Sequence, residues 1–280
     1  MKIMVLNSSG SVGKSTITRE LFAPRLDNPL IIEVEGQNTS TKDFLSDKNK
    51  KYFDLKVFDN SFENLYLDLI ENNDVIVDVG ASQLENFFVE FGKMAGVEML
   101  FDYFVVPTIN TDKAQNDTIK TLIFLRDTKN IDAEKIKVIF NGVKNSVESD
   151  FGTLLSAAKN LGFNLDAELY IRENKVFNEL GLMRKTLADV YQSDLNAYKN
   201  KILGAATPQL KIALVKMDMA NRLGHTAIDD LDLCFQKITG QNSFFADKFS
   251  NNKVPSKTPK TPKKQKEEEN IEVSGDDEEL

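Results

Sequence analysis

Short apolar runs alternate with segments of helical spacing over the first 190 residues. "KIMVL" at the start is an apolar run of strand length, and "DVIVDVG", from Asp74 to Gly80, reads as a buried strand. Strands joined by helices of this length imply right-handed crossovers and a mostly parallel sheet covered on both faces. We therefore predict an α/β, doubly wound fold. The expected strands span 2–6, 29–36, 52–58, 74–80, 102–108, 135–143 and 167–171, and the expected helices 15–22, 61–72, 112–126, 150–161 and 174–183.

The pattern changes towards the C-terminus. From Val190 to Ile238 it is helical throughout, and from about Gln241 we expect disorder. Residues 253–266 carry six lysines and no acids, whereas residues 267–280 carry eight acids and no bases. Such a tail is either an interaction arm or a solubilising extension. The predicted division is a nucleotide-binding domain at 1–190, a helical segment packed on it at 191–240, and a disordered tail at 241–280.

Composition narrows the class of protein. The 280 residues are 41% hydrophobic, and the net charge of −8 argues against coating nucleic acid through the overall field. No stretch of about 18 apolar residues and no leader pattern is present, so we expect an uncleaved, soluble, cytoplasmic chain without membrane contact. The single Cys234 and the single His225 exclude an internal disulfide and a His/Cys zinc cluster. We interpret Cys234 as a small buried thiol rather than a nucleophile.

The stretch "LNSSGSVGKST", Leu6 to Thr16, follows the first strand and opens the first helix. Gly13, Lys14 and Ser15 match the end of the phosphate-loop pattern, but Ser8 stands where its first glycine is expected. In this context backbone N–H groups and the helix N-terminus face phosphate oxygens, and the lysine ammonium reaches them. A serine- and glycine-rich turn is the alternative, and it leaves the lysine unexplained.

A phosphate loop of this type also needs oxygen ligands for magnesium. The hydroxyl of Ser15 is one candidate. Asp78 is the second, because it lies at the carboxyl end of an apolar strand, where open α/β sheets bind their ligands. The alternative for Asp78 is an acidic strand end that caps a helix.

Three motifs together resemble a known family. "SSGSVGKST", "IIEVEGQN" and "DVIVDVG" look like the nucleotide motifs of the ParA/MinD class of deviant phosphate-loop ATPases. Within that class the loop and the following "ELFAPRL" are similar to the StbB-type plasmid stability proteins, and more distantly to VirC-type ATPases of conjugation. The resemblance covers roughly residues 1–190. It implies a nucleotide-dependent switch that binds ATP and Mg²⁺ and serves plasmid stability, partition or transfer.

The resemblance also implies roles for individual residues. Lys14 would bind phosphate, Asp78 would be the Walker B acid, and Glu33 and Glu35 stand where members carry two aspartates that assist the magnesium shell and the attacking water. Asn141 matches a position that often recognises adenine, although an asparagine ending a strand is also an ordinary turn residue. Two surface glutamates would likewise give the pattern of Glu33 and Glu35. The predicted catalytic residues are Lys14, Glu35 and Asp78; the metal ligands are Ser15 and Asp78; the nucleotide contacts are Ser9, Gly10, Ser11, Val12, Gly13, Lys14, Ser15, Thr16 and Asn141.

One departure from the family pattern affects the expected rate of ATP hydrolysis. Members place a signature lysine four residues before the last loop glycine, which reaches the phosphates of the partner in a nucleotide-dependent homodimer; here that position is Ser9. We therefore expect binding with slow hydrolysis. The resemblance further implies a DNA-binding adaptor protein and nonspecific DNA as partners. Arg184 and Lys185 with residues 198–201 form the candidate DNA patch, and solvated lysines on ordinary helices are the alternative.

Two other functions fit the same motifs. A small-molecule kinase or synthetase, of the dethiobiotin synthetase kind, shares the loop and the sheet but needs a pocket for its acceptor. A catalytically inactive scaffold would keep only the fold; the altered Ser8 and Ser9 favour it, and the retained Lys14, Ser15 and Asp78 oppose it.

Overall fold

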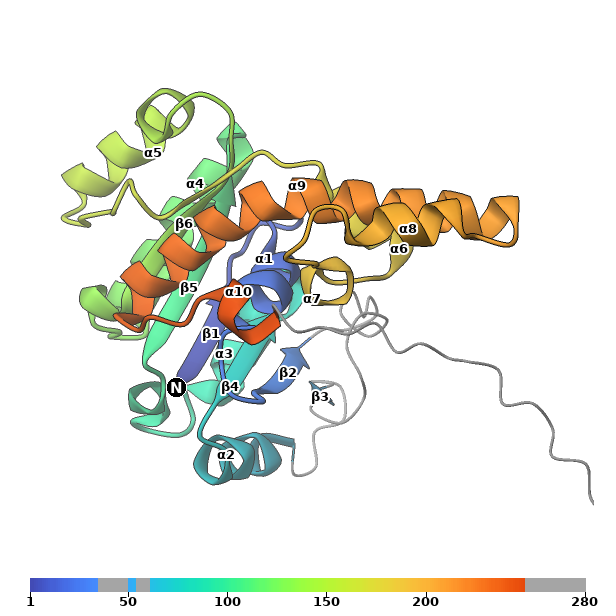
Figure 1. Cartoon of the computed structure of the whole chain (residues 1–280). Helices are drawn as coiled ribbons and strands as arrows, with labels where there is room; N and C mark the ends of the chain where they lie inside the picture. The colour runs from blue at the N-terminus through green and yellow to red at the C-terminus, as the bar shows by residue number, and fades with distance from the viewer. Residues whose placement is uncertain (35–49, 54–60, 250–280) are drawn as a thin grey trace, which may run out of the picture.

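A computed structural model describes residues 1–34, 50–53 and 61–249 of the chain (Figure 1). Its centre is a seven-stranded sheet in the order β3-β2-β4-β1-β5-β6-β7. Every pairing is parallel, which confirms the predicted doubly wound α/β class. The strands are β1 (Lys2–Leu6), β2 (Leu30–Val34), β3 (Lys50–Phe53), β4 (Val75–Val79), β5 (Tyr103–Ile109), β6 (Ile136–Val143) and β7 (Tyr170–Arg172). Most of the third predicted strand, 54–58, lies outside the described residues.

Helices cover both faces because the strands are apolar on both sides. In β1, Met4 and Leu6 belong to one buried cluster, and Ile3 and Val5 belong to the other. This alternation follows from the two-residue period of a strand. The first face is covered by α2 (Ser61–Glu71), α3 (Leu84–Phe91), α4 (Asp112–Ile123) and α5 (Val147–Asn160). The second is covered by α1 (Lys14–Thr16) with its continuation η1 (Ile17–Phe22), α6 (Val176–Met183), α7 (Leu187–Val190), α9 (Pro208–Thr239) and α10 (Phe245–Phe249).

The C-terminal helical segment is interrupted rather than continuous. Helix α7 ends at Val190, α8 spans Ala197–Leu203, and α9 begins at Pro208. Thr207 caps α9 through its hydroxyl, which accepts a hydrogen bond from the Leu210 N–H. The second half of α9 packs across the sheet, whereas its first half projects from the domain with α8 beside it (Figure 1). No helix among the described residues is long and apolar enough to cross a membrane.

The ordered part of the chain extends beyond the expected boundary near Gln241. Phe245 in α10 is fully buried and lies edge to face against Tyr191, with 5.3 Å between ring centroids. Its N–H also donates to the Asp232 carboxylate at 3.0 Å. The expectation of disorder from Gln241 was therefore wrong for residues 241–249, because the burial of one aromatic ring outweighs the polar composition around it. The predicted disorder of 250–280 lies outside the described residues, and the division into domains stays a prediction.

Candidate nucleotide site

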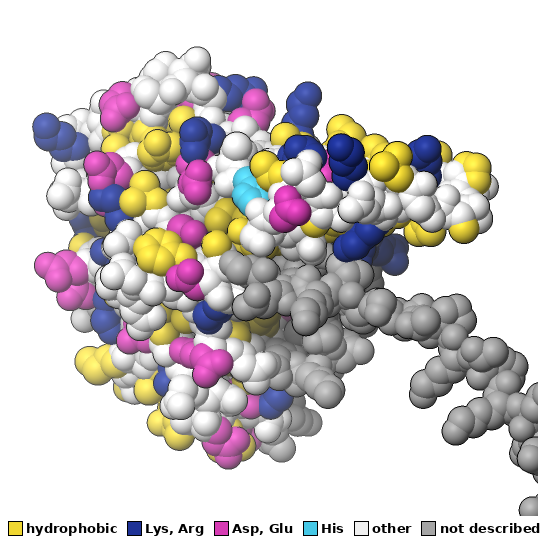
Figure 2. All heavy atoms as spheres, viewed as in Figure 1, with side chains coloured by type: hydrophobic (Ala, Val, Ile, Leu, Met, Phe, Trp, Pro, Cys, Tyr) yellow, Lys and Arg dark blue, Asp and Glu magenta, His cyan; other side chains and the backbone are white. Residues whose placement is uncertain are grey.

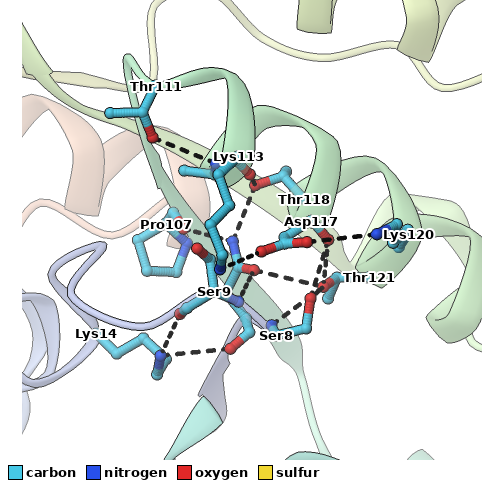
Figure 3. Close-up of polar contacts among 12 residues, drawn as sticks. Ser8, Ser9, Lys14, Pro107, Thr111, Lys113, Asp117, Thr118, Lys120 and Thr121 are labelled. Carbon is cyan, nitrogen blue, oxygen red and sulfur yellow. Dashed lines mark hydrogen bonds and ion pairs between the residues drawn. The ribbon is translucent and has the colours of Figure 1, made fainter.

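The loop between β1 and α1 has the backbone shape of an anion cradle. Ser11, at φ 58°, and Gly13, at φ 97°, both adopt left-handed conformations. Such turns direct successive N–H groups into one concave surface that suits phosphate oxygens. Lys14 follows at the first position of α1 and is only 8% exposed. Its ammonium donates to the carbonyls of Ser9, at 2.8 Å, and Asn7, at 3.3 Å, so the cation is held over the loop (Figure 3).

Asn141 joins the loop from the end of β6. Its side-chain amide donates to the Val12 carbonyl at 3.0 Å. A Cβ added at Gly13 would lie 2.3 Å from the same nitrogen, which together with the left-handed backbone explains the glycine. The structure therefore brings Asn141 to the predicted site. In this structure its amide holds the loop backbone, and its role towards adenine stays a prediction.

Two polar side chains at the start of the loop, directly after β1, connect the site to α4. The Asn7 amide donates to the Pro107 carbonyl and the Thr118 hydroxyl, both at 2.9 Å. The Ser8 hydroxyl donates to the Asp117 carbonyl at 3.1 Å and lies 3.0 Å from the Thr121 hydroxyl (Figure 3). Ser8 does not have a positive φ, so a side chain is tolerated where the general pattern has glycine.

The sequence did not predict that Thr118 and Thr121 of α4 hydrogen-bond to Asn7 and Ser8. Thr118 and Thr121 are more than 100 positions from the loop, and only the topology shows that α4 lies beside it. The polar Asn7, directly after an apolar strand, was the available signal.

Two buried carboxylates lie next to each other at the carboxyl ends of β2 and β4. Glu33 is paired in register with Asp78, and the two residues are 3% and 2% exposed. Residues in register on parallel strands share a face, here that of Ile31 and Ile76, two positions earlier. Buried carboxylates favour a nearby cation or hydrogen-bond donors.

The other predicted residues lie on α1 or outside the described part of the chain. Ser15 and Thr16, both half-buried, form the first turn of α1, which contacts β4. Glu35 lies outside the described residues. Searched over 1–34, 50–53 and 61–249, the chain has no group of three or more His, Cys, Asp or Glu side chains arranged to hold a metal. The predicted metal ligands, the Ser15 hydroxyl and Asp78, both offer oxygen, the ligand type that Mg²⁺ prefers, and their role stays a prediction.

A cavity of about 550 Å³ adjoins the loop on the side of Ser8. It lies between the residues that follow β4 and helix α4, and no single motif in the sequence pointed to it. Six of its nine lining residues are polar, and Ala81, Leu84 and Phe124 add a larger apolar surface. Its lining residues are Ser8, Ala81, Ser82, Leu84, Glu85, Asn86, Lys120, Thr121 and Phe124.

The predicted DNA patch is split between two elements. Lys199 and Lys201 are exposed on α8, whereas Arg184 ends α6 in a left-handed conformation and Lys185 is half-buried. Cys234 is fully buried, as expected, and its Sγ donates to the Tyr170 carbonyl at 3.3 Å; its low reactivity stays a prediction.

Comparison with known proteins finds similarity among solved structures. No family model and no curated protein sequence matches the chain. The MinC:MinD cell division complex of Aquifex aeolicus matches at 15% identity and a TM-score of 0.44, covering 79% of this chain and 95% of that one. McdA of Cyanothece with ATP matches at 14% identity and a TM-score of 0.40, covering 78% and 95%.

A plasmid partition protein of Borrelia burgdorferi bound to AMPPNP matches at 17% identity and a TM-score of 0.41, covering 63% of this chain and 88% of that one. At these identities, and with TM-scores below 0.5, the matches say nothing about what this chain does. Its function has to be argued from its own residues.

Proposed function

We propose that the protein is a nucleotide-dependent switch that binds ATP with Mg²⁺ at the β1–α1 loop and hydrolyses it slowly. The observation that carries the proposal is the position of Lys14. The Lys14 side chain is largely buried, and its ammonium donates to the carbonyls of Ser9 and Asn7 in the same loop that contains the left-handed residues Ser11 and Gly13. Holding a cation over a concave row of N–H groups provides both parts of a polyphosphate site.

Each predicted residue then has a physical task. The loop N–H groups from Gly10 to Gly13 and the start of α1 would bind phosphate oxygens, and Lys14 would exchange its loop carbonyls for them. Ser15 and Asp78 would hold Mg²⁺, which neutralises charge on the phosphates during transfer. Glu33, in register with Asp78, would orient water in the magnesium shell. Asn141 would keep the loop in its binding conformation.

The position of Ser9 supports slow turnover. Ser9 is 3% exposed, its N–H donates to the Asn7 side chain, and its carbonyl accepts from Lys14. This position therefore contributes no cation to a partner's phosphates. A trans cation is worth roughly 10³ to 10⁵ in phosphoryl-transfer rate, so its loss predicts slow basal hydrolysis.

The biological setting is the finer part of the proposal. We assign the switch to plasmid stability, partition or conjugative transfer of the StbB type, with a DNA-binding adaptor and nonspecific DNA as partners and a nucleotide-dependent homodimer as the active state. The support is the resemblance of the three motifs. Addition of DNA or adaptor should raise turnover if either brings the missing cation.

Steady-state phosphate release tests the proposal. We expect slow, magnesium-dependent release by the native protein and a further fall of at least tenfold in Lys14→Ala and in Asp78→Asn. Lys93→Ala is the matched control, because Lys93 belongs to the other Gly-Lys pair and its side chain is 64% exposed. Turnover that neither site variant reduces would remove this site from the mechanism.

A phosphoryl-transfer enzyme is the second candidate, and the cavity beside Ser8 favours it. The cavity has room for a small molecule and is bordered by Lys120 and Glu85, which suit a polar acceptor. Phosphate release without an added acceptor supports the switch. ATP consumption only in the presence of a small hydroxyl or carboxylate compound supports the kinase, and absence of ATP binding supports the inactive scaffold.

A further inference from the structure

Helix α8 and the first half of α9 form a projecting arm, residues 197–219, with an exposed apolar stripe. Ile212, Val215 and Met219 are 59%, 38% and 56% exposed. Their spacing of three and four residues places them on one side of the helix. Leu214 and Met217, half-buried, lie on another side of α9. The stripe therefore belongs to neither the sheet nor the α8 contact.

The arm is also basic. Lys199, Lys201, Lys211 and Lys216 are all exposed, and Asp218 is the one acid in residues 197–219. Asp218 accepts from Arg222 at 3.0 Å, which offsets its charge. In the helical projection Lys211 and Lys216 flank the apolar stripe. Figure 2 shows apolar and basic side chains along the projecting part of the molecule. Such a surface fits an acidic chain with a few apolar residues.

The chain itself contains such a segment. Residues 267–280, "EEENIEVSGDDEEL", carry eight acids, and Ile271 and Val273 lie among them. We infer that this acidic segment docks on the apolar and basic arm of the same chain, with Ile271 and Val273 against the Ile212–Met219 stripe and the acids near the flanking lysines. A second copy of the arm fits less well, because two basic surfaces repel each other.

The length of the chain allows this contact. The described part ends at Phe249, in α10, which is held near Asp232 of α9 through the Phe245 N–H. From Asp232 to Ile212 the helix axis spans about 30 Å. The 17 residues 250–266 reach about 56 Å when extended. Tethering by a linker of this length gives an effective concentration on the order of millimolar, so even a weak contact would be populated.

The lysine-rich segment 253–266 is the other basic part of the chain to which the acidic segment 267–280 could bind. It offers six lysines but only Val254 and three prolines as apolar residues, so it lacks a surface for Ile271 and Val273. The arm supplies both charge and apolar area. A docked segment would shield the arm from other anionic partners until they displace it.

Paramagnetic relaxation in the full-length protein tests this inference. A nitroxide is attached at Ser274→Cys; Cys234 does not interfere, because it is fully buried. We expect the amide signals of residues 210–219 to broaden at low salt and to recover at about 0.5 M salt, because exposed charges are then screened. Lys211→Glu with Lys216→Glu, and separately Ile271→Ser with Val273→Ser, should each abolish the broadening. Lys159→Glu, an exposed lysine on α5, should leave it unchanged.

Two outcomes would overturn the inference. The first is broadening that is absent from the arm or lies elsewhere. The second is broadening that also arises when isotope-labelled chains without the nitroxide are mixed with unlabelled chains that carry it, because the contact would then join two copies. Neither readout depends on nucleotide, so failure here is separate from failure of the proposed ATP site.

Discussion

The side chain of Asn141 occupies the space that a side chain at residue 13 would need. A Cβ at Gly13 would lie 2.3 Å from Asn141 Nδ2, and the backbone there has φ 97°. This pair links the end of β6 to the loop that we assign to phosphate binding, so the geometry of the loop depends on a residue 128 positions away.

Gly13→Ala should therefore destabilise the fold and distort the loop. We expect a loss of roughly 1–3 kcal/mol in the free energy of unfolding, because a left-handed backbone and a steric clash combine. Denaturant unfolding measures it. Gly10→Ala is the control, since nothing lies within 4 Å of its added Cβ. If both variants unfold alike, the clash with Asn141 is not a constraint; if Asn141→Ala partly rescues Gly13→Ala, the contact is supported.

Phe245→Ala should destabilise the protein by about 3–5 kcal/mol, because a fully buried ring leaves a cavity. Phe244, its neighbour, is 41% exposed, and Phe244→Ala should cost less than about 1 kcal/mol. Equal melting temperatures for Phe245→Ala and Phe244→Ala would contradict the packing of α10.

Deletion of the residues after Asn252 should leave the melting temperature nearly unchanged, since that segment contains few apolar residues.

Cys234 should resist thiol reagents in the folded protein. Burial raises the pKa of its thiol to about 12, so the reactive thiolate is scarce at pH 8. The unfolded thiol has a pKa near 8.5, so unfolding releases the proton more readily and stability should fall as pH rises from about 8.5 towards 12. Labelling with and without denaturant checks this. Rapid labelling of the native chain at pH 8 would show that the thiol is accessible.

The elements that the sequence predicted correctly are the ones with local signals. The run before Asn7 and the Gly13-Lys14-Ser15 motif place a strand, a loop and a helix within a few residues, and Asp78 ends an unbroken apolar run. The hydrogen bonds from Asn7 and Ser8 to α4 were not predicted, because they join residues that are more than 100 positions apart. The burial of Phe245 was hidden by the polar residues around it.

Equilibrium titration with a fluorescent ATP analogue and magnesium tests the central claim most directly. We predict saturable binding by the native protein and by Lys93→Ala, and a loss of affinity of at least tenfold in Lys14→Ala, because only backbone dipoles then face the phosphate charge. Thermal unfolding of each variant confirms that it is folded. Unchanged affinity in folded Lys14→Ala would contradict the assignment of the β1–α1 loop as the nucleotide site.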